Sequence, residues 1–200
     1  SIWVNDNPIY ANAGIERDDW FNRNIRGGLN LILPAVYIKN SIFLDSTIFA
    51  TPPKPGTRLE GGHRLLTYFS GDLGYGQGLC FWEPEDIREA SKYSDIYKKY
   101  RHYLEKDYYH LLPMPNSLDA WDAWNYYDPE TDSGIVFLFR LGESKEEEKL
   151  ISIKPIKNPG DYKWTLVAGE ATVDPSASGL KAKLKPSGAA MIHYQKIEAI

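Results

Sequence analysis

The carboxylate of Asp6 stands at a place in the sequence where α/β enzymes present reacting groups. Asp6 follows the short apolar run Ile2-Trp3-Val4 and Asn5, a pattern that predicts a strand ending in polar residues. In (β/α)₈ barrels the loops at the carboxyl ends of the strands open onto the substrate. A carboxylic acid placed there can donate and accept a proton during a reaction. The alternative is a turn residue whose side chain caps its own backbone.

A glycine-rich run over residues 73–82 is predicted to be a strand, and it carries Tyr75 and Trp82. Its glycines permit either close packing of the backbone or the close approach of a ligand. Together with Trp3 and Asn5 beside the candidate carboxylate, these two aromatic side chains are the candidate substrate-binding residues.

We expect no metal site and no cofactor. The four histidines of the chain show no ligand spacing. The run from Asp128 to Gly134 resembles a calcium loop, but its glycine stands one place late and no Glu stands where a bidentate ligand is needed. It is interpreted as a hairpin turn. Residues 71–78 lack the Lys-Ser/Thr pair of a phosphate-binding loop and the full dinucleotide fingerprint.

Composition narrows the class of protein. The chain has 200 residues, 42% of them hydrophobic and 14% aromatic, which predicts a globular protein. Its formal net charge of -4 argues against a nucleic-acid or anionic-membrane partner, because such partners require a basic face. The single cysteine, Cys80, leaves the cellular compartment open. No apolar run reaches the length of a membrane helix, and residues 1–15 lack the features of a signal peptide.

The first half of the chain alternates predicted strands and helices. The apolar spacing predicts a helix over residues 15–26, a strand over 29–33 stopped by Pro34, an exposed loop over 51–62, and a short helix over 63–70. A further helix begins at Pro84, where acidic residues lie near its start and basic residues near its end. This alternation indicates parallel α/β units.

The second half changes to short predicted strands bounded by turn residues, which indicates an antiparallel β-sandwich. We place the boundary between residues 1–115 and residues 116–200. Trp121 and Trp124 could stack on a ligand, but aromatic residues at strand positions more often fill a core, and both are interpreted as structural. The expected strands cover residues 121–127, 134–141, 149–153, 162–168, 180–185 and 189–195.

The order of these elements resembles the end of the α-galactosidases of glycoside hydrolase family 36 (clan D). The resemblance rests on Trp3-Val4-Asn5-Asp6, which matches a Trp-x-x-Asp run on the sixth barrel strand, and on Ile15-Glu16-Arg17 in the next helix. It continues through Leu73-Gly74-Tyr75 and Tyr97-Lys98-Lys99-Tyr100-Arg101. The resemblance implies that residues 1–115 are strands six to eight of a (β/α)₈ TIM barrel and that residues 116–200 are the C-terminal β-sandwich.

The resemblance also implies a mechanism. The family is a set of retaining glycosidases, in which two carboxylates about 5 Å apart act across the scissile bond. Asp6 matches the acid/base, whereas the nucleophile of the family lies in a Lys-Trp-Asp-x-Asn type run that this sequence does not contain. The chain is therefore expected to be a fragment of a hydrolase of α-galactosides or related α-linked sugars, inactive alone. Gly76-Gln77-Gly78 replaces the usual acidic continuation and leaves the exact sugar open.

Two other readings remain at this point: a non-catalytic carbohydrate-binding module, and a structural β-domain that braces a barrel. If the hydrolase reading holds, the expected partners are a carbohydrate substrate and the missing N-terminal half of the barrel. A barrel cut before its sixth strand exposes unpaired strand edges, so self-association through those edges is the alternative to that half.

Overall fold

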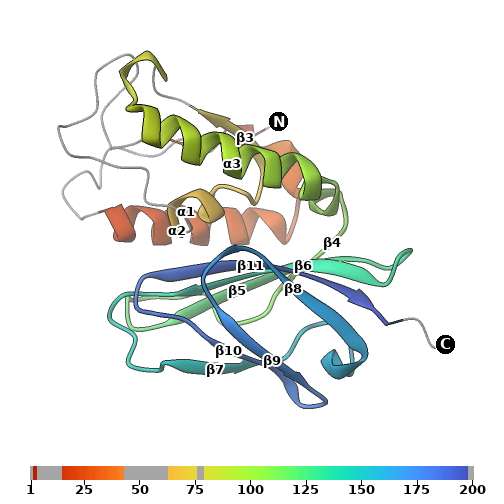
Figure 1. The fold of residues 1–200 in the computed structure, drawn as a ribbon. Helices are drawn as coiled ribbons and strands as arrows, with labels where there is room; N and C mark the ends of the chain where they lie inside the picture. Colours follow the sequence, from red (N-terminus) through yellow and green to blue (C-terminus); the bar gives the residue numbers. More distant parts are fainter. Residues whose placement is uncertain (1, 4–14, 43–62, 76–78, 198–200) are drawn as a thin grey trace.

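The structure is a computed structural model, and it describes residues 2–3, 15–42, 63–75 and 79–197. Within these residues, three helices and a small sheet form one part of the molecule, and a β-sandwich of two sheets lies against it (Figure 1). None of the helices in this part of the chain is long and apolar enough to cross a membrane.

The small sheet is parallel, in the order β1 (Ile2–Trp3), β2 (Ile38–Ile42) and β3 (Asp72–Tyr75). Along the chain, α1 (Ile15–Asn30) lies between β1 and β2, and α2 (His63–Thr67) lies between β2 and β3. The alternation of strand and helix that the sequence predicts is therefore present. These three strands do not close into a barrel within the described residues.

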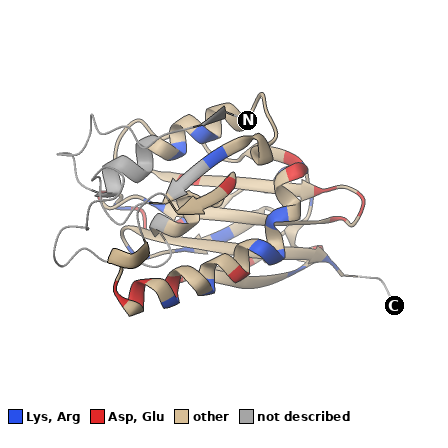
Figure 2. Cartoon of the chain, turned by 90° about the horizontal axis from the view of Figure 1, so that it is seen from above, with Lys and Arg blue, Asp and Glu red and all other residues tan. Residues whose placement is uncertain are grey.

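The helix predicted to begin at Pro84 is confirmed as α3 (Pro84–Tyr100). Its first turn carries Glu85 and Asp86 and its last turn carries Lys98 and Lys99, so its charges oppose the helix dipole (Figure 2). The Tyr97 hydroxyl donates a hydrogen bond of 2.7 Å to the Gly71 carbonyl, which joins the helix to the start of β3. Three short 3-10 helices lie in the same half of the chain: η2 (Ala35–Tyr37), η3 (Leu79–Phe81) and η4 (Arg101–Glu105).

The sandwich is antiparallel throughout its described strands. The larger sheet has the order β4-β5-β6-β11-β8, and the smaller sheet has the order β7-β10-β9. A 3-10 turn, η5 (Pro159–Asp161), precedes β8. The strands are β4 (Asp107–His110), β5 (Trp121–Asp128), β6 (Ser133–Arg140), β7 (Glu148–Ile151), β8 (Tyr162–Gly169), β9 (Thr172–Ser176), β10 (Gly179–Lys183) and β11 (Gly188–Lys196).

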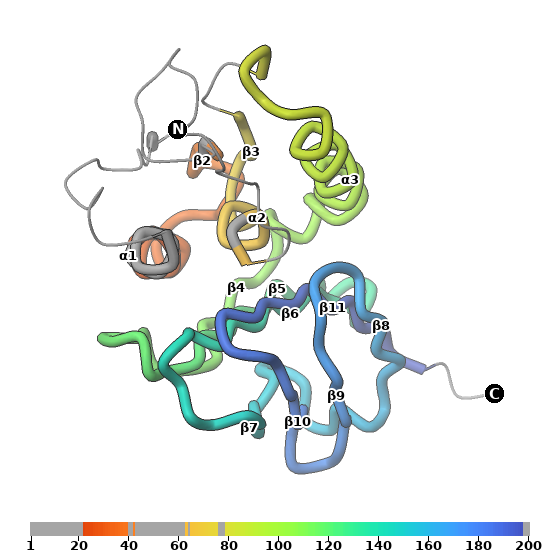
Figure 3. Tube along the Cα trace, turned by 60° about the vertical axis from the view of Figure 1, so that its left-hand side comes forward, coloured from red at the N-terminus to blue at the C-terminus, as the bar shows by residue number. Residues whose placement is uncertain are grey.

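The central strands of the larger sheet, β5, β6 and β11, are largely buried on both faces, because α1 and α2 cover one face and the smaller sheet covers the other (Figure 3). Alternate residues of β6 separate accordingly: Phe137 packs toward the helices, whereas Val136 and Leu138 pack between the two sheets. This explains why residues 135–139 form a continuous apolar run rather than an alternating one. The interpretation of Trp121 and Trp124 as core residues is confirmed, since they are 3% and 0% exposed.

The strand predicted over residues 29–33 is wrong. Helix α1 continues to Asn30, and the Leu33 amide then donates a hydrogen bond of 2.9 Å to the Leu29 carbonyl in the closing turn. The next strand, β2, begins only at Ile38. Leu31 and Ile32 are 62% and 75% exposed, so the apolar run that suggested a strand is instead a surface turn.

The glycine-rich strand predicted over residues 73–82 is shorter than expected. Strand β3 ends at Tyr75, and Leu79–Phe81 form the 3-10 helix η3. The intervening glycines and the loop predicted over residues 51–62 lie outside the described residues. A run of three glycines in five residues disfavours a regular strand because each loses much conformational entropy on folding.

Two further strands, in addition to β2, were missed by the sequence analysis. Strand β9 contains Pro175, which is tolerated because β9 is an edge strand paired only with β10 among the described strands. Strand β4 follows η4 directly and pairs with β5, so the larger sheet takes its first strand from before residue 115.

Candidate functional site

The carboxyl ends of the three parallel strands define the edge where the sequence predicts the site. Trp3 is the last residue of β1 and pairs with Lys39, while Tyr75 is the last residue of β3 and pairs with Ile42. Asn5 and Asp6, the remaining candidates from the first strand, lie outside the described residues. Their assignment stays a prediction that rests on their place in the sequence just after β1.

Tyr75 and Trp82, two of the predicted substrate-binding residues, are brought together. Their rings are 5.6 Å apart at an interplanar angle of 85°, an edge-to-face contact between the end of β3 and the residue before α3. The Tyr75 hydroxyl donates to the Ala90 carbonyl at 3.0 Å and lies 2.6 Å from the Ser94 hydroxyl. Burial raises the pKa of Tyr75, and the hydrogen bond with Ser94 opposes that rise. Tyr75 therefore stays neutral and holds α3 against the sheet.

Trp82 contributes a polar group to the same place. Its side chain is 5% exposed, and its indole nitrogen Nε1 is buried without a hydrogen-bond partner among the described residues. A buried indole N–H normally finds an acceptor, because leaving it unsatisfied costs free energy. This donor at the carboxyl edge of the sheet is suited to a hydroxyl group or an ordered water.

Helix α1, which follows the Asp6 segment in the chain, is fixed to the sandwich by buried polar contacts that sequence reasoning missed. Arg23 is 0% exposed; its Nη1 donates to the Thr67 hydroxyl at 2.9 Å, and its Nε lies 3.8 Å from Oδ2 of the fully buried Asp122. The guanidinium also lies 4.5 Å from the centre of the Phe139 ring. His110 Nε2 is 2.8 Å from Asp122 Oδ1. One carboxylate thus joins α1 to β4 and β5.

Two further contacts extend this attachment along the helix. Asn24 Nδ2 donates to the Pro115 carbonyl at 2.7 Å, and Asn30 Nδ2 donates to the Tyr126 hydroxyl at 2.7 Å. Arg26 is also 0% exposed, and its guanidinium lies 4.2 Å from the centre of the Tyr68 ring. The available signal in the sequence was Asp122 itself, a carboxylate between aromatic residues of a buried strand, which requires a charged or hydrogen-bonding partner.

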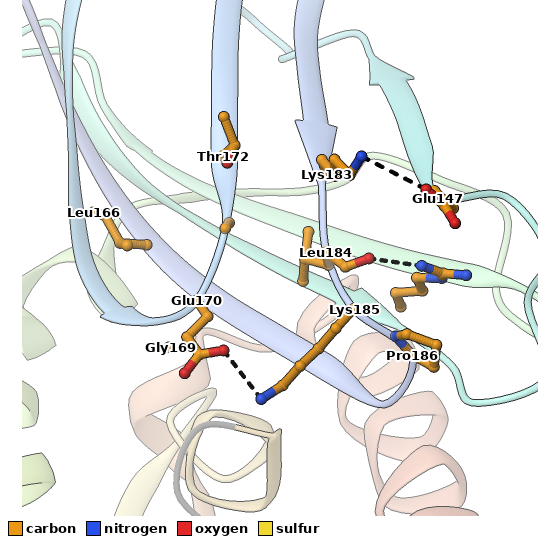
Figure 4. A pocket seen from close by; sticks show the side chains of 11 residues that line it. Glu147, Leu166, Gly169, Glu170, Thr172, Lys183, Leu184, Lys185 and Pro186 are labelled. Carbon is orange, nitrogen blue, oxygen red and sulfur yellow. Dashed lines mark hydrogen bonds and ion pairs between the residues drawn. The ribbon is translucent and has the colours of Figure 1, made fainter.

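The sandwich carries an open cleft of about 640 Å³ at one end, between the β8–β9 turn and the end of β10 (Figure 4). Its charged side chains are paired across it: Lys183 with Glu147 at 3.5 Å, and Lys185 with Glu170 at 3.0 Å. Arg140 is held by the Leu184 carbonyl at 2.7 Å. None of the described residues that line this cleft is aromatic, so it offers no stacking platform for a sugar ring.

No group of three or more His, Cys, Asp or Glu side chains is placed to hold a metal ion in the part of the chain that the structure describes. The run from Asp128 to Gly134 forms the turn between β5 and β6, where Asp128 pairs with Ser133 across the hairpin. This confirms its interpretation as a hairpin turn.

The sequence and the structure of the chain were compared with those of known proteins, and the similarity found is one of fold. No family model matches the sequence, and no curated protein sequence matches it. Among solved structures, the GH36 α-galactosidase AgaB from Geobacillus stearothermophilus matches with a TM-score of 0.67 at 17% identity, over 90% of this chain and 24% of that chain. A doubly substituted AgaA from the same organism, in complex with stachyose, matches with a TM-score of 0.67 at 16% identity, over 90% and 24%.

An α-galactosidase from Lactobacillus brevis matches with a TM-score of 0.64 at 15% identity, over 92% of this chain and 25% of that chain. At these identities the likeness is one of fold. The chain spans about a quarter of the length of the structures it matches. Its fold is therefore similar to that of one part of the GH36 α-galactosidases, consistent with a C-terminal part.

Proposed function

We propose that this chain is the C-terminal part of a retaining glycoside hydrolase that acts on α-galactosides or related α-linked sugars. The observation that carries the proposal is the likeness of fold over 90% of the chain, together with the Trp3-Val4-Asn5-Asp6 run that begins in β1. The similarity to an α-galactosidase in complex with stachyose supports an α-galactosyl substrate.

Asp6 is the acid/base in this proposal. In the sequence Asp6 comes three residues after the end of β1, and such barrels place their reacting groups just after the carboxyl ends of their strands. The acid protonates the leaving oxygen in the first step, and the resulting carboxylate deprotonates the attacking water in the second. The nucleophile comes from outside these 200 residues, because they contain no Lys-Trp-Asp run. The chain by itself is then inactive.

The partner in this proposal is the remaining part of a (β/α)₈ barrel, of which β1, β2 and β3 are strands six to eight. Among the described strands, β1 and β3 are the edges of the parallel sheet and each is paired on one side only. Open edges offer unpaired backbone groups to further strands. The barrel half supplies those strands, or a second copy of this chain does.

Trp3, Asn5, Tyr75 and Trp82 are the proposed sugar-contacting residues. Trp82 offers its buried N–H, and the Tyr75 ring fixes the orientation of that indole through the edge-to-face contact. Sugars present both hydroxyl groups and an apolar ring face, so a buried donor beside aromatic side chains suits them.

The second candidate is a structural β-domain without catalysis of its own. The observation that favours it is the single core shared by α2, α3 and the larger sheet, which would brace a barrel from outside. In that case Asp6 takes no part in the reaction, so the Asp6 variant decides between the two.

The test measures hydrolysis of an aryl α-galactoside and of a natural α-galactoside. It compares the isolated chain, the complete barrel-containing polypeptide and the Asp6→Ala form of that polypeptide. We expect no turnover by the isolated chain and a loss of roughly 10⁴-fold or more in kcat/KM for the natural sugar in the variant. The activated aryl group leaves without protonation, so the variant should lose far less activity on the aryl α-galactoside. Added azide should restore turnover, because it replaces the missing base in the second step.

Asp72→Ala is the matched control, since Asp72 is exposed at the opposite, amino end of β3. This variant should retain its activity. Robust turnover by the isolated chain would show that the nucleophile lies within these 200 residues. An unimpaired Asp6→Ala enzyme would show that Asp6 is not the acid/base.

A further inference from the structure

A second cavity lies where the end of α3 meets the sandwich. It has a volume of about 400 Å³. Its floor is the helix-facing side of β8 and β11, where His193 pairs with Thr165 and Gln195 pairs with Lys163 across the two strands. The last turn of α3 and the start of η4 form its wall, whereas Tyr75 of the proposed sugar site meets α3 further toward its start. The two sites are therefore separate.

The charged side chains that line this cavity are positive. Lys99 and Lys163 line it, and none of its described lining residues is an Asp or Glu. Neither lysine forms an ion pair within the part of the chain that the structure describes. Neighbouring lysines behave differently, since Lys98 pairs with Asp95 at 3.3 Å and Lys196 with Asp132 at 3.0 Å. In a chain of net charge -4, this is a local concentration of uncompensated positive charge.

His193 is a half-buried residue of the floor, and its Nε2 lies 3.0 Å from the Tyr103 hydroxyl, which lies 2.7 Å from the Ser133 hydroxyl. Burial lowers the pKa of His193, and the nearby Lys99 and His102 lower it further.

The groups that face His193 from every packed element are cationic, neutral or apolar. They are Lys99 and Tyr100 from α3, His102 and Tyr103 from η4, Thr165 and Lys163 from β8, and Ile135 from β6. No carboxylate among them stabilises the imidazolium. A bound anion would supply that missing negative charge.

We propose that this cavity binds a phosphate monoester of a small hydroxylated molecule, with the phosphate between Lys99 and Lys163. Two lysines match a doubly charged tetrahedral group, and the Thr165 hydroxyl and Gln195 amide provide hydrogen-bonding groups for the remainder of the ligand. The Tyr100 ring, which lies 5.4 Å from the His193 ring, forms the apolar part of the wall. The site is independent of the hydrolase reading above.

The proposal implies that binding takes up a proton. Because an anion favours the charged imidazole, its binding raises the pKa of His193 toward or above the ordinary value. By linkage, affinity rises as the pH falls through the histidine range. Sulfate is the probe for this measurement, since it remains doubly charged over that range whereas a phosphate monoester has a second pKa near 6.

The experiment titrates the 200-residue chain with glucose 6-phosphate, glucose, inorganic phosphate and sulfate by calorimetry at low ionic strength. We expect glucose 6-phosphate to bind and glucose not to bind. Lys99→Gln and Lys163→Gln should each weaken binding by about tenfold or more, as expected for one charge-assisted contact. Lys98→Gln is the matched control, because Lys98 is the adjacent lysine of α3 and is already paired with Asp95. It should leave the affinity unchanged.

His193→Gln provides a second readout that a merely structural change would not move. Sulfate should bind the wild-type chain more tightly at pH 5.5 than at pH 8, and this difference should become clearly smaller in the variant, in which His102 is the one histidine left among the described lining residues. Binding of inorganic phosphate as tight as that of glucose 6-phosphate would assign the site to free phosphate. Equal weakening by Lys98→Gln and Lys99→Gln, or equal binding of glucose and its phosphate, would overturn the proposal.

Discussion

His110 Nε2 and Asp122 Oδ1 lie 2.8 Å apart at the junction of the helices and the sandwich. Because a carboxylate only accepts, the imidazole carries its proton on Nε2. The other carboxylate oxygen lies 3.8 Å from Arg23 Nε, so both oxygens of one fully buried carboxylate face donors from different elements. This contact holds α1 against the sandwich. Helix α1 directly follows residues 4–14, which contain Asp6, so the same contact fixes the end of the segment that carries the candidate acid/base.

Asp122→Ala tests the energetic weight of this contact. The substitution removes a fully buried carboxylate that is the partner of His110 and lies 3.8 Å from Arg23 Nε, and breaking a buried pair in this way costs about 3–5 kcal/mol of unfolding free energy. Chemical denaturation followed by tryptophan fluorescence measures it. Asp119→Ala is the control, because Asp119 is exposed on the approach to the same strand and should change stability by less than about 0.5 kcal/mol. Equal effects of the two substitutions would show that the buried contact has no special weight.

Two adjacent glycines of α1 provide a matched pair for the same junction. A methyl group on Gly28 would lie 3.7 Å from Met114 Cε, which is an ordinary contact. Gly28→Ala should therefore raise the free energy of unfolding by about 0.5–1 kcal/mol, because Ala has the higher helix propensity. A methyl group on Gly27 would lie 3.3 Å from His110 Cε1 and 3.4 Å from the Tyr108 hydroxyl. We expect Gly27→Ala to be less stable than Gly28→Ala, because it displaces the imidazole from its carboxylate. Melting temperatures of the two variants compare them, and equal stabilisation would argue against tight packing at Gly27.

The sequence predicts elements best where local signals and tertiary packing agree. Pro84 with its acidic first turn defines the start of α3 without help from the rest of the fold. The alternation of lysine and apolar residues in β10 likewise predicts which face is buried, and Lys181 and Lys183 are exposed as expected. The hairpin between β5 and β6 follows from its turn residues.

The missed features depend on contacts between distant segments. Residues 29–33 read as a strand because most of them are apolar, yet α1 continues through Gly27 and Gly28, and the absence of a side chain at Gly27 permits the close approach of His110. The pairing of Arg23 with Asp122 joins residues far apart in sequence, and no local pattern predicts it. The same holds for the positively charged cavity around His193, whose lysines come from α3 and β8.

The carboxyl group of Asp132 should make the free energy of unfolding depend on pH in the acid range. Burial alone raises the pKa of its carboxyl, but hydrogen bonds from Tyr162 at 2.7 Å, Lys196 at 3.0 Å and Tyr127 at 2.9 Å outweigh this, and the pKa is lowered. A lowered folded-state pKa contributes stability above the unfolded value near 3.9, and this contribution is lost as the pH falls through the folded value.

Asp132→Asn therefore should destabilise the chain at pH 7, and its difference from the wild type should shrink as the pH falls below the unfolded value near 3.9. Asn is a suitable replacement because Asp132 has a φ of 46°, a left-handed conformation that Asn tolerates. Urea midpoints of both proteins at pH 7, 5 and 3 measure the convergence. A constant difference across this range would mean that the carboxylate charge is not responsible.

The last prediction concerns the surface at the amino end of β2. Leu31 and Ile32 are 62% and 75% exposed, and Tyr37 is 54% exposed, which places three large apolar side chains on the approach to an open parallel sheet. Exposed apolar side chains favour association with another chain, and so do the unpaired edges of β1 and β3 in the same sheet. We expect the isolated chain to self-associate at micromolar concentration, and we expect the remaining barrel half to suppress this by covering the same surface.

Sedimentation velocity of the isolated chain tests this, with the Ile32→Lys variant placing a charge at the most exposed of the three positions. The variant should shift the distribution toward the monomer, because burying an unpaired ammonium in an interface costs far more than burying Ile32 recovers. Lys98→Gln again serves as a control on a separate surface and should leave the distribution unchanged. A clean monomer for the unmodified chain would show that the edges of the parallel sheet are already protected, and the proposed need for a barrel partner would then lose its physical basis.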